Sequence, residues 1–185
     1  MSAREKRGHW LKKYSVFLCS GLVSAVFAVR YHIQQETLLP TPDNGSQLHC
    51  AVAQVQDGDS LLADCPGGHL RVRLWGIDAA EMGQKPWGEQ ARTYLQELLQ
   101  AYPQVRLEIT DTDRYGRSVA RIWVDQQQDI GLQMVRAGKA IVYEQYNDSE
   151  HYRQVQAEAK QAALGIWAVQ GGQQNPALWR RLNPR

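Results

Sequence analysis

Five short segments with strand-like patterning limit most strongly what this chain can fold into. Residues 69–77 (HLRVRLWGI) alternate apolar and polar side chains along much of their length, as a strand with one buried face does. Residues 51–55 and 60–63 flank the turn sequence QDGD and read as a hairpin. Two further segments, 105–110 and 118–124, lie on either side of the polar turn DTDRYGR. The chain is therefore predicted to build its core around a sheet of short strands.

Helical spacing interrupts and follows these strands. In residues 88–102, apolar side chains recur at the three- and four-residue intervals that place them on one side of a helix. Shorter and longer helices are predicted at 130–137 and 149–164. Short strands with helices mostly behind them predict an α+β domain, a small closed barrel of the OB-fold type with about three packed helices.

The N-terminal residues have the composition of a targeting segment. Basic residues up to Lys13 precede an uncharged apolar run at 14–29. This run would span about 24 Å as a helix, short of a hydrocarbon core of about 30 Å. A signal peptide cleaved after Val26-Phe27-Ala28 and an uncleaved membrane anchor both stay open. Either would send the domain across the membrane, to a periplasmic or extracellular location.

This reading divides the chain into four parts. Residues 1–30 are the leader, 31–48 a linker, 49–168 the folded domain and 169–185 a C-terminal tail. We expect the tail to be loosely held, because it is short, polar and terminal.

The charge balance excludes a basic shell for passive nucleic-acid binding. The chain has 21 Lys and Arg against 19 Asp and Glu, a net charge of +2. The leader holds six of the basic residues and one acidic residue, which leaves 15 against 18 and a net charge of −3 for the rest. Any phosphate contact must therefore come from a few well-placed arginines.

Two cysteines flank the predicted hairpin. Its turn would bring Cys50 and Cys65 nearly opposite each other. A disulfide between them would suit an exported protein and would stabilise it by about 3 kcal/mol. Two unrelated reduced thiols remain the alternative.

Four carboxylates lie at the predicted hairpin turn and at the end of a predicted strand, and two arginines lie on neighbouring elements. They are Asp57, Asp59, Asp78, Glu81, Arg73 and Arg117. Carboxylates suit a hard cation such as Ca²⁺, whereas the scattered histidines offer no zinc spacing. Because Arg73 and Asp78 have opposite strand parity, both can face one site only if the chain bulges or leaves the strand near Gly76.

Each of these elements has a simpler explanation when taken alone. Asp-Gly-Asp is most often just a hairpin turn, and DRYGR alone is a polar turn. The tryptophans of the domain are expected to pack in the core or at its rim. Their joint order along one chain is what points to a function.

That order resembles the staphylococcal nuclease, or thermonuclease, family. The matching pieces are VQDGDS at 55–60, RLWGIDAAE at 73–81, DRYGRSVARI at 113–122, LQMVRAGKA at 132–140 and LGIW at 164–167. The resemblance covers roughly residues 50–167 and implies a five-stranded OB-fold barrel with three helices. It also implies Ca²⁺-dependent hydrolysis of phosphodiester bonds in DNA and RNA that leaves 3′-phosphates.

The resemblance also implies a role for each residue of the cluster. Asp59, Asp78 and the backbone carbonyl of Ala79 resemble the calcium ligands. Asp57 would act on the cation through water. Glu81 matches the glutamate that holds or deprotonates the attacking water, and Arg73 and Arg117 match the arginines that bind the scissile phosphate.

The chain departs from the family pattern at two places. Ala79-Ala80 replaces the usual Thr-Pro, and we expect the loss of a fixed proline φ to weaken calcium binding. Of the two tyrosines that line the family's nucleotide pocket, one falls at Glu144 and the other at Tyr146. Tyr143 or Tyr115 would supply the missing ring. The candidate substrate-binding residues are therefore Arg114, Tyr115, Tyr143 and Tyr146.

The sequence thus predicts an exported, monomeric, Ca²⁺-dependent endonuclease, tethered to the membrane if its leader is retained. Two rivals stay open. One is an inactive barrel of this family that binds nucleic acid or a protein partner. The other is an envelope structural protein whose carboxylates bind Ca²⁺ only to stabilise the fold.

Overall fold

The structure is a computed structural model that describes residues 38–125 and 127–184. The predicted leader at 1–30, and the linker up to residue 37, lie outside the described residues. Within the described part of the chain, no helix is both long and apolar enough to cross a membrane.

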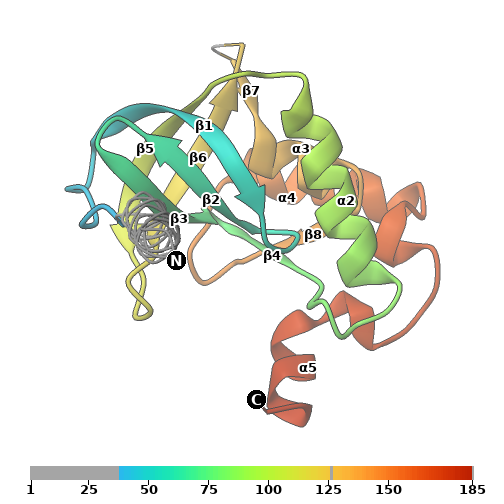
Figure 1. Ribbon diagram of the computed structural model, residues 1–185. Coiled ribbons are helices and arrows are strands. Elements are labelled where there is room, and N and C mark those ends of the chain that lie inside the picture. The colour runs from blue at the N-terminus through green and yellow to red at the C-terminus, as the bar shows by residue number, and fades with distance from the viewer. Residues whose placement is uncertain (1–37, 126, 185) are drawn as a thin grey trace, which may run out of the picture. The chain divides into compact units, whose positions relative to one another are not determined.

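A closed barrel of five strands forms the centre of the fold (Figure 1). Its strands are β1 (Gln47–Val55), β2 (Ser60–Cys65), β3 (Gly68–Leu74), β5 (Val105–Thr112) and β6 (Ser118–Val124). They follow one another in the order β3-β2-β1-β5-β6, and a parallel pairing of β3 with β6 closes the barrel. The predicted α+β barrel is confirmed.

Three shorter strands were not expected. β7 (Gln128–Asp129) extends the edge of β6, while β4 (Ile77–Ala79) and β8 (Ala140–Val142) pair with each other in a separate small sheet. Segments of two or three residues carry too little periodicity to be recognised from sequence.

The extended strand conformation is interrupted between β3 and β4, at Gly76. Gly76 has a φ of +70°, and a Cβ atom on it would lie 2.6 Å from Nδ2 of Asn147. The Asn147 amide donates to the Gly76 carbonyl at 3.2 Å, which fixes the turn. This break removes the parity conflict between Arg73 and Asp78, because the two residues no longer belong to one strand.

Four helices accompany the barrel in the described ranges. They are α2 (Trp87–Gln100), α3 (Ile130–Arg136), α4 (Glu150–Gln161) and α5 (Pro176–Leu182). In Figure 1, α2, α3 and α4 gather on one side of the barrel, and α5 lies apart from them. The first three match the predicted helices within three residues at each end, whereas α5 was not predicted.

The core lies inside the barrel and under the helices. Side chains that are almost fully buried come from alternate positions of the strands, among them Leu61, Val72, Leu74, Leu107, Ile109 and Ile122. Ala91, Leu95 and Leu99 of α2 cover this core. Burying one such Leu or Ile side chain contributes about 2 to 3 kcal/mol, so the strand ends rest on a well-packed support.

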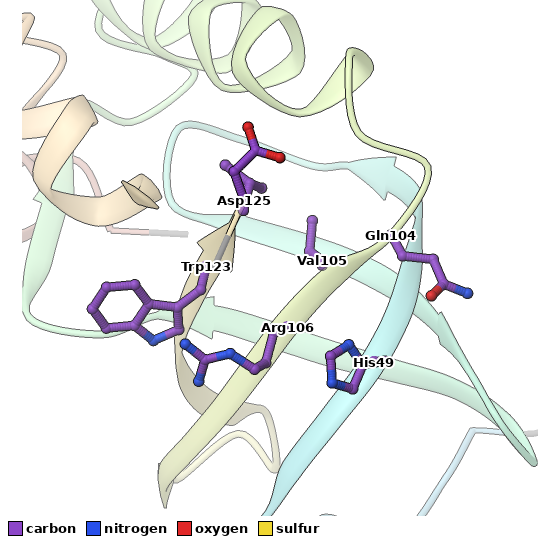
Figure 2. Close-up of a pocket in the computed structure, with 7 residues that line it drawn as sticks. His49, Gln104, Val105, Arg106, Trp123 and Asp125 are labelled. Carbon is purple, nitrogen blue, oxygen red and sulfur yellow. The ribbon is translucent and has the colours of Figure 1, made fainter. Parts of the chain in front are cut away.

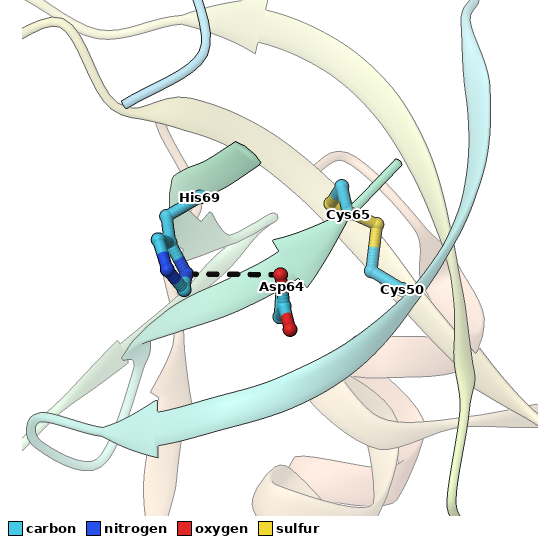
Figure 3. Close-up of a disulfide and its surroundings, with 4 residues drawn as sticks. All are labelled: Cys50, Asp64, Cys65 and His69. Carbon is cyan, nitrogen blue, oxygen red and sulfur yellow. Dashed lines mark ion pairs between the residues drawn. A yellow bond between two sulfur atoms is a disulfide. The ribbon is translucent and has the colours of Figure 1, made fainter. Parts of the chain in front are cut away.

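A disulfide joins Cys50 of β1 to Cys65 at the end of β2 (Figure 3). The register between the strands pairs Ala51 with Asp64, so the two cysteines occupy the next facing position. Across the neighbouring pair of strands, Nδ1 of His69 lies 3.9 Å from Oδ1 of Asp64. The disulfide thus closes the far end of the hairpin whose turn carries Asp57 and Asp59.

The tail is more ordered than expected. Short 3₁₀ turns at Gly165–Trp167 and Gly172–Gln174 lead into α5. The Gln173 amide donates to the carbonyl of Val169 at 2.7 Å and to that of Ile166 at 3.3 Å. The tail therefore contains regular structure that the sequence did not predict, and polar side chains in it bond to its backbone.

Candidate active site

Asp57 shapes the turn between β1 and β2. Its Oδ1 accepts hydrogen bonds from the backbone N–H of Asp59, at 3.0 Å, and from the hydroxyl of Ser60. The Asp59 carbonyl accepts from the N–H of Leu74 at 2.8 Å, which ties the turn to β3. Asp57 thus fixes the backbone that carries Asp59.

Asp59 is a buried acid with two donors. Its Oδ2 accepts from the backbone N–H of Ala79 at 2.8 Å and lies 3.2 Å from Nη2 of Arg73. Burial raises the pKa of Asp59 to about 7, although the positive charge of Arg73 acts to lower it. A carboxylate with so perturbed a pKa is typical of a functional site.

Arg73 connects Asp59 to the second buried acid. Its Nη2 also lies 3.4 Å from Oδ1 of Asp78, which is only 2% exposed. Its Nη1 donates to the Leu74 carbonyl at 3.0 Å and so fixes the guanidinium in place. One arginine therefore contacts both carboxylates that the sequence assigned to a cation.

Ala79 sits beside this pair on β4. Its backbone N–H is the donor to Asp59, and its Cα pairs with Ala140 of β8. The methyl side chain is buried, and the backbone polar groups alone carry any role at the site.

Glu81 is held by a residue that sequence reasoning missed. The buried side chain of Gln84 accepts from the Glu81 N–H at 2.7 Å, and the Gln84 N–H donates to the Glu81 carbonyl at 2.8 Å. A glutamine three residues after a glutamate is a common pattern, so the sequence could not predict that residues 81–84 form a hydrogen-bonded turn.

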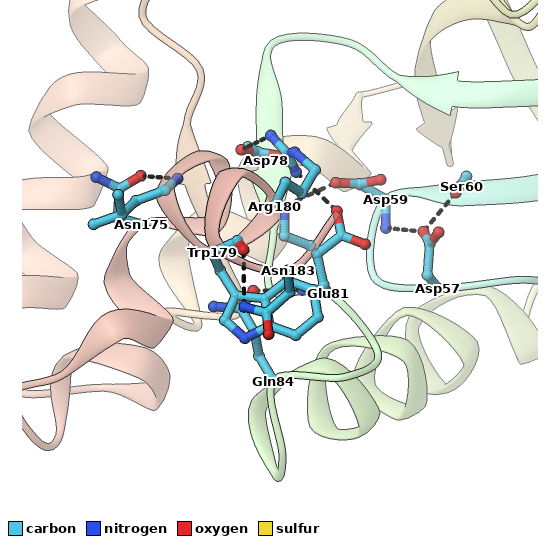
Figure 4. A network of polar contacts seen from close by, with 12 residues as sticks. Asp57, Asp59, Ser60, Asp78, Glu81, Gln84, Asn175, Trp179, Arg180 and Asn183 are labelled. Atoms are coloured by element: carbon cyan, nitrogen blue, oxygen red, sulfur yellow. Dashed lines mark hydrogen bonds and ion pairs between the residues drawn. The ribbon is translucent and has the colours of Figure 1, made fainter. Parts of the chain in front are cut away.

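A second residue that the sequence did not indicate contacts both Asp78 and Glu81 (Figure 4). Arg180 of α5 donates from Nη1 to Asp78 Oδ1 at 3.0 Å and from Nη2 to Asp78 Oδ2 at 2.9 Å. Its Nη1 also lies 2.9 Å from Oε1 of Glu81. Hydrogen bonds to Asp78, and secondarily to Glu81, raise the pKa of Arg180 above its ordinary value.

The two predicted phosphate-binding arginines lie on β3 and immediately before β6, which pair with each other. Arg73 pairs directly with Val119 across the parallel β3–β6 ladder. Arg117 is two residues before Val119, so its side chain is expected on the same outward face as that of Arg73. In the structure the Arg117 Nε donates to Asp113 Oδ2 at 2.7 Å.

Asp113 organises the turn that carries Arg117. Its Oδ1 accepts from the N–H groups of Tyr115, at 2.9 Å, and of Arg117, at 3.0 Å. Partial burial acts to raise the pKa of Asp113, but the hydrogen bonds from Arg117 and Tyr115 outweigh it and lower that pKa. Arg71, which was not predicted, donates to the Tyr115 carbonyl at 3.2 Å on the same turn.

Tyr115 extends from this turn into solvent. Its side chain is 62% exposed, and its ring centroid lies 4.8 Å from Cζ of Arg114 and 5.7 Å from Cζ of Arg117. An exposed ring flanked by two guanidinium groups offers both stacking and phosphate contacts to a nucleic-acid strand.

The other two candidate tyrosines lie after β8. The rings of Tyr143 and Tyr146 meet edge to face, with centroids 4.9 Å apart, and Tyr146 is 57% exposed. The Tyr143 N–H donates to the Gly76 carbonyl at 2.9 Å, so this loop borders the break between β3 and β4. Glu144 is exposed on the same loop.

The donor chemistry of the cluster suits a hard cation. Buried carboxylate oxygens of Asp59 and Asp78 adjoin one another through Arg73, and Ca²⁺ takes such oxygens as ligands. As the side chains stand in the described ranges, no three of the Asp, Glu, His or Cys residues enclose a metal position. Arg180 forms ion pairs with both Asp78 and Glu81 and so places a positive charge between them.

A separate hollow of about 560 Å³ lies on the barrel's outer face (Figure 2). His49, Arg106 and Trp123 line it, and none of the predicted site residues does. The Arg106 guanidinium lies 5.2 Å from the Trp123 ring centroid and 4.0 Å from Glu108, so its charge is already balanced. We therefore place the function at the carboxylate cluster.

Comparison with known proteins identifies the family of the chain. The family model of staphylococcal nuclease homologues matches residues 71–169. An uncharacterized endonuclease of Haemophilus influenzae is 36% identical over 133 residues, which cover 71% of this chain and 72% of that protein. An uncharacterized endonuclease of Escherichia coli O157:H7 is 33% identical over 135 residues, covering 73% and 86% of the two chains. A probable endonuclease of Botryotinia fuckeliana is 36% identical over 113 residues, covering 54% and 43%.

The fold is an α+β OB-fold barrel, and its candidate site consists of carboxylates and arginines. The chain belongs to the staphylococcal nuclease homologue family. The resemblance drawn from its motifs is confirmed.

Proposed function

We propose that the protein is a calcium-dependent nuclease that uses water to hydrolyse phosphodiester bonds within DNA and RNA strands and leaves 3′-phosphates. Membership of the family and relatives named as endonucleases support a nuclease. One observation in the structure supports the proposed chemistry most directly. Arg73 contacts both Asp59 and Asp78, so a phosphate-binding group adjoins the group that would bind a cation.

The cation-binding part of the site consists of Asp59, Asp78 and the Ala79 carbonyl, with Asp57 holding the turn. When bound there, Ca²⁺ would supply positive charge that stabilises the negative charge developing on the phosphate. Burial disfavours the charged form of Asp59, and a bound cation would favour that form.

The remaining residues act on the water and the phosphate. Glu81 holds the attacking water or takes its proton at a carboxylate oxygen. Arg73 and Arg117 donate N–H groups to the phosphate oxygens, and the planar guanidinium fork fits two of those oxygens at once. Hydrogen bonds to Gln84 keep the Glu81 backbone in place during these steps.

Substrate contacts continue outward along the face that carries the arginines. Arg114 and Tyr115 would contact the strand beyond the scissile bond, and Tyr143 and Tyr146 would offer rings on the other loop. Stacking on rings is tolerant of base identity, which agrees with broad specificity.

We further propose that the protein acts outside the cytoplasm as a monomer. The basic and apolar leader supports export, and the Cys50–Cys65 disulfide suits an oxidising compartment. If the leader is retained, it would tether the protein to the membrane.

The proposal is tested by incubating the purified protein with single-stranded DNA, duplex DNA and RNA, in Ca²⁺ and in EDTA. We expect digestion in Ca²⁺, none in EDTA, and products that carry 3′-phosphates. Arg117→Ala should lose activity, whereas Arg153→Ala, which removes an exposed arginine on α4, should keep it. A folded protein that binds DNA without cutting it would instead indicate an inactive binding module.

A further inference from the structure

The C-terminal helix places a positive charge where the proposed function needs a cation. The guanidinium of Arg180 occupies both oxygens of Asp78 and one oxygen of Glu81, at 2.9 to 3.0 Å (Figure 4). Arg180 lies about a hundred residues beyond both acids, so this contact arises from the way the tail docks. While Arg180 is docked, its N–H groups occupy part of the acceptor capacity of both acids, which leaves fewer lone pairs for a metal ion or a water.

Specific contacts direct α5 to this position. Asn175 caps the helix by accepting from the Leu178 N–H at 2.8 Å. The Gln84 amide donates to the Gly172 carbonyl at 3.2 Å, which joins the tail to the loop that holds Glu81. The Trp179 ring packs on Gly83 so closely that a Cβ atom there would lie 2.6 Å from it. The docking surface is thus the loop of the candidate site itself.

The same helix has features of a segment that can leave. It contains seven residues, and an isolated helix of that length is not stable in water. Leu178 and Leu182 are 37% and 72% exposed, so α5 buries little apolar surface. Arg180 itself is 38% exposed, which leaves its guanidinium open to exchange with solvent. Its attachment therefore depends on a few polar contacts and one aromatic ring.

Arg180 differs from Arg73 in that it contacts both oxygens of Asp78, so it would compete with a divalent cation for that carboxylate. Both would bind the Asp78 oxygens, and their positive charges would repel each other there. Binding of one must therefore weaken binding of the other by the same factor.

We propose that α5 is an autoinhibitory segment in which Arg180 competes with the metal ion for Asp78 and with the attacking water for Glu81. This inference rests on the proposed function, because it takes the cation site as real. In the docked state Arg180 occupies the Asp78 carboxylate, so a cation must displace Arg180 from Asp78 in order to bind there. The apparent affinity for calcium is then the intrinsic affinity multiplied by the fraction of molecules with α5 undocked.

The test is calcium binding to the purified full-length protein, measured by isothermal titration calorimetry without substrate. Arg180→Gln should bind Ca²⁺ about tenfold more tightly than the wild type, or more, as expected if α5 is docked in at least nine molecules of ten. Arg181→Gln, on the exposed side of the same helix, is the matched control and should bind like the wild type. Trp179→Ala removes the ring that docks α5 and should tighten binding as Arg180→Gln does.

A second readout follows the helix directly. Adding Ca²⁺ to the wild type should release Trp179 from Gly83 and shift tryptophan emission to longer wavelength. Trp179→Phe should not show this shift. Circular dichroism of each variant establishes that it is folded.

The outcomes separate this inference from the proposed function. Equal calcium affinity in the wild type, Arg180→Gln and Trp179→Ala would overturn the inference and leave the nuclease proposal intact. Absence of calcium binding in all of them would overturn both. Tighter binding in the two variants, with Arg181→Gln unchanged, supports the competition.

Discussion

Nη2 of Arg73 lies 3.2 Å from Oδ2 of Asp59, on the outward edge of a buried carboxylate. The guanidinium thus contacts the acid that would bind the cation, and its strand pairs with β6, which follows Arg117 directly in the chain. This contact joins the residues proposed to bind the cation to those proposed to bind the phosphate.

Replacing Arg73 with lysine should therefore damage catalysis. Lysine keeps the charge but loses the planar fork that reaches Asp59, Asp78 and a phosphate together. We expect kcat/KM for DNA hydrolysis to fall about 100-fold. Arg106→Lys, in the hollow of the outer face, is the control and should keep the wild-type rate. A rate for Arg73→Lys equal to that of the control would remove Arg73 from the mechanism.

The lowered pKa of Asp113 predicts a pH-dependent contribution to stability. The unfolded pKa is about 3.9, so this stabilisation is present above that pH and is lost as the pH falls through the lower folded pKa. Asp113→Asn should reduce the free energy of unfolding by about 1 kcal/mol at pH 7, after allowance for solvent screening.

Urea denaturation at pH 7 and at pH 3 would measure this effect. The difference between wild type and Asp113→Asn should shrink at the lower pH. Asp148→Asn, which alters an exposed acid, should change stability by less than about 0.5 kcal/mol. A difference that persists unchanged at pH 3 would contradict the assignment.

Tyr152 and Asp129 form a buried hydrogen bond beneath the helices. The tyrosine hydroxyl donates to Asp129 Oδ2 at 2.8 Å, while Oδ1 of the same acid caps α3 through the Leu132 N–H. Burial, and then the charge of Asp129, raise the pKa of Tyr152. Tyr152→Phe should cost about 1 to 2 kcal/mol in denaturant unfolding. Tyr146→Phe, at an exposed ring, should cost almost nothing, and equal losses would argue against a special role for the buried pair.

The disulfide should contribute to stability through the unfolded state. Cys50 and Cys65 are separated by 15 residues, a loop for which closure stabilises by about 3 kcal/mol. A variant with both cysteines changed to alanine should unfold at correspondingly lower denaturant. Dithiothreitol should bring the wild type to the same midpoint and leave the variant unaffected. If the reductant has no effect on the wild type, the bond does not stabilise the fold.

The barrel and its three main helices could be predicted because they carry long apolar periodicities. The break at Gly76 could also be anticipated, since Arg73 and Asp78 could not otherwise face one site. By contrast, α5 has seven residues in a polar segment and no apolar stripe that would reveal it. Only Asn175 followed by Pro176, a helix-start signal, could have suggested it.

The unpredicted site contacts have a common physical origin. Arg180 meets Asp78 and Glu81 through tertiary docking of the tail, which leaves no local pattern in the sequence. Gln84 supports Glu81 through a turn whose side-chain hydrogen bond has no strong residue requirement. The order of the motifs along the chain was therefore enough to predict the residues proposed to act on substrate. The residues that contact them, Gln84 and Arg180, could be identified only from the structure.

The most direct test of the account is the single-turnover rate of duplex DNA hydrolysis by Glu81→Gln in saturating Ca²⁺. Glu150→Gln, at an exposed glutamate on α4, is the matched control. If Glu81 handles the attacking water, its variant should be slower by about 10²- to 10⁴-fold while remaining folded, and the control should match the wild type. A Glu81→Gln rate equal to that of the wild type would contradict the site.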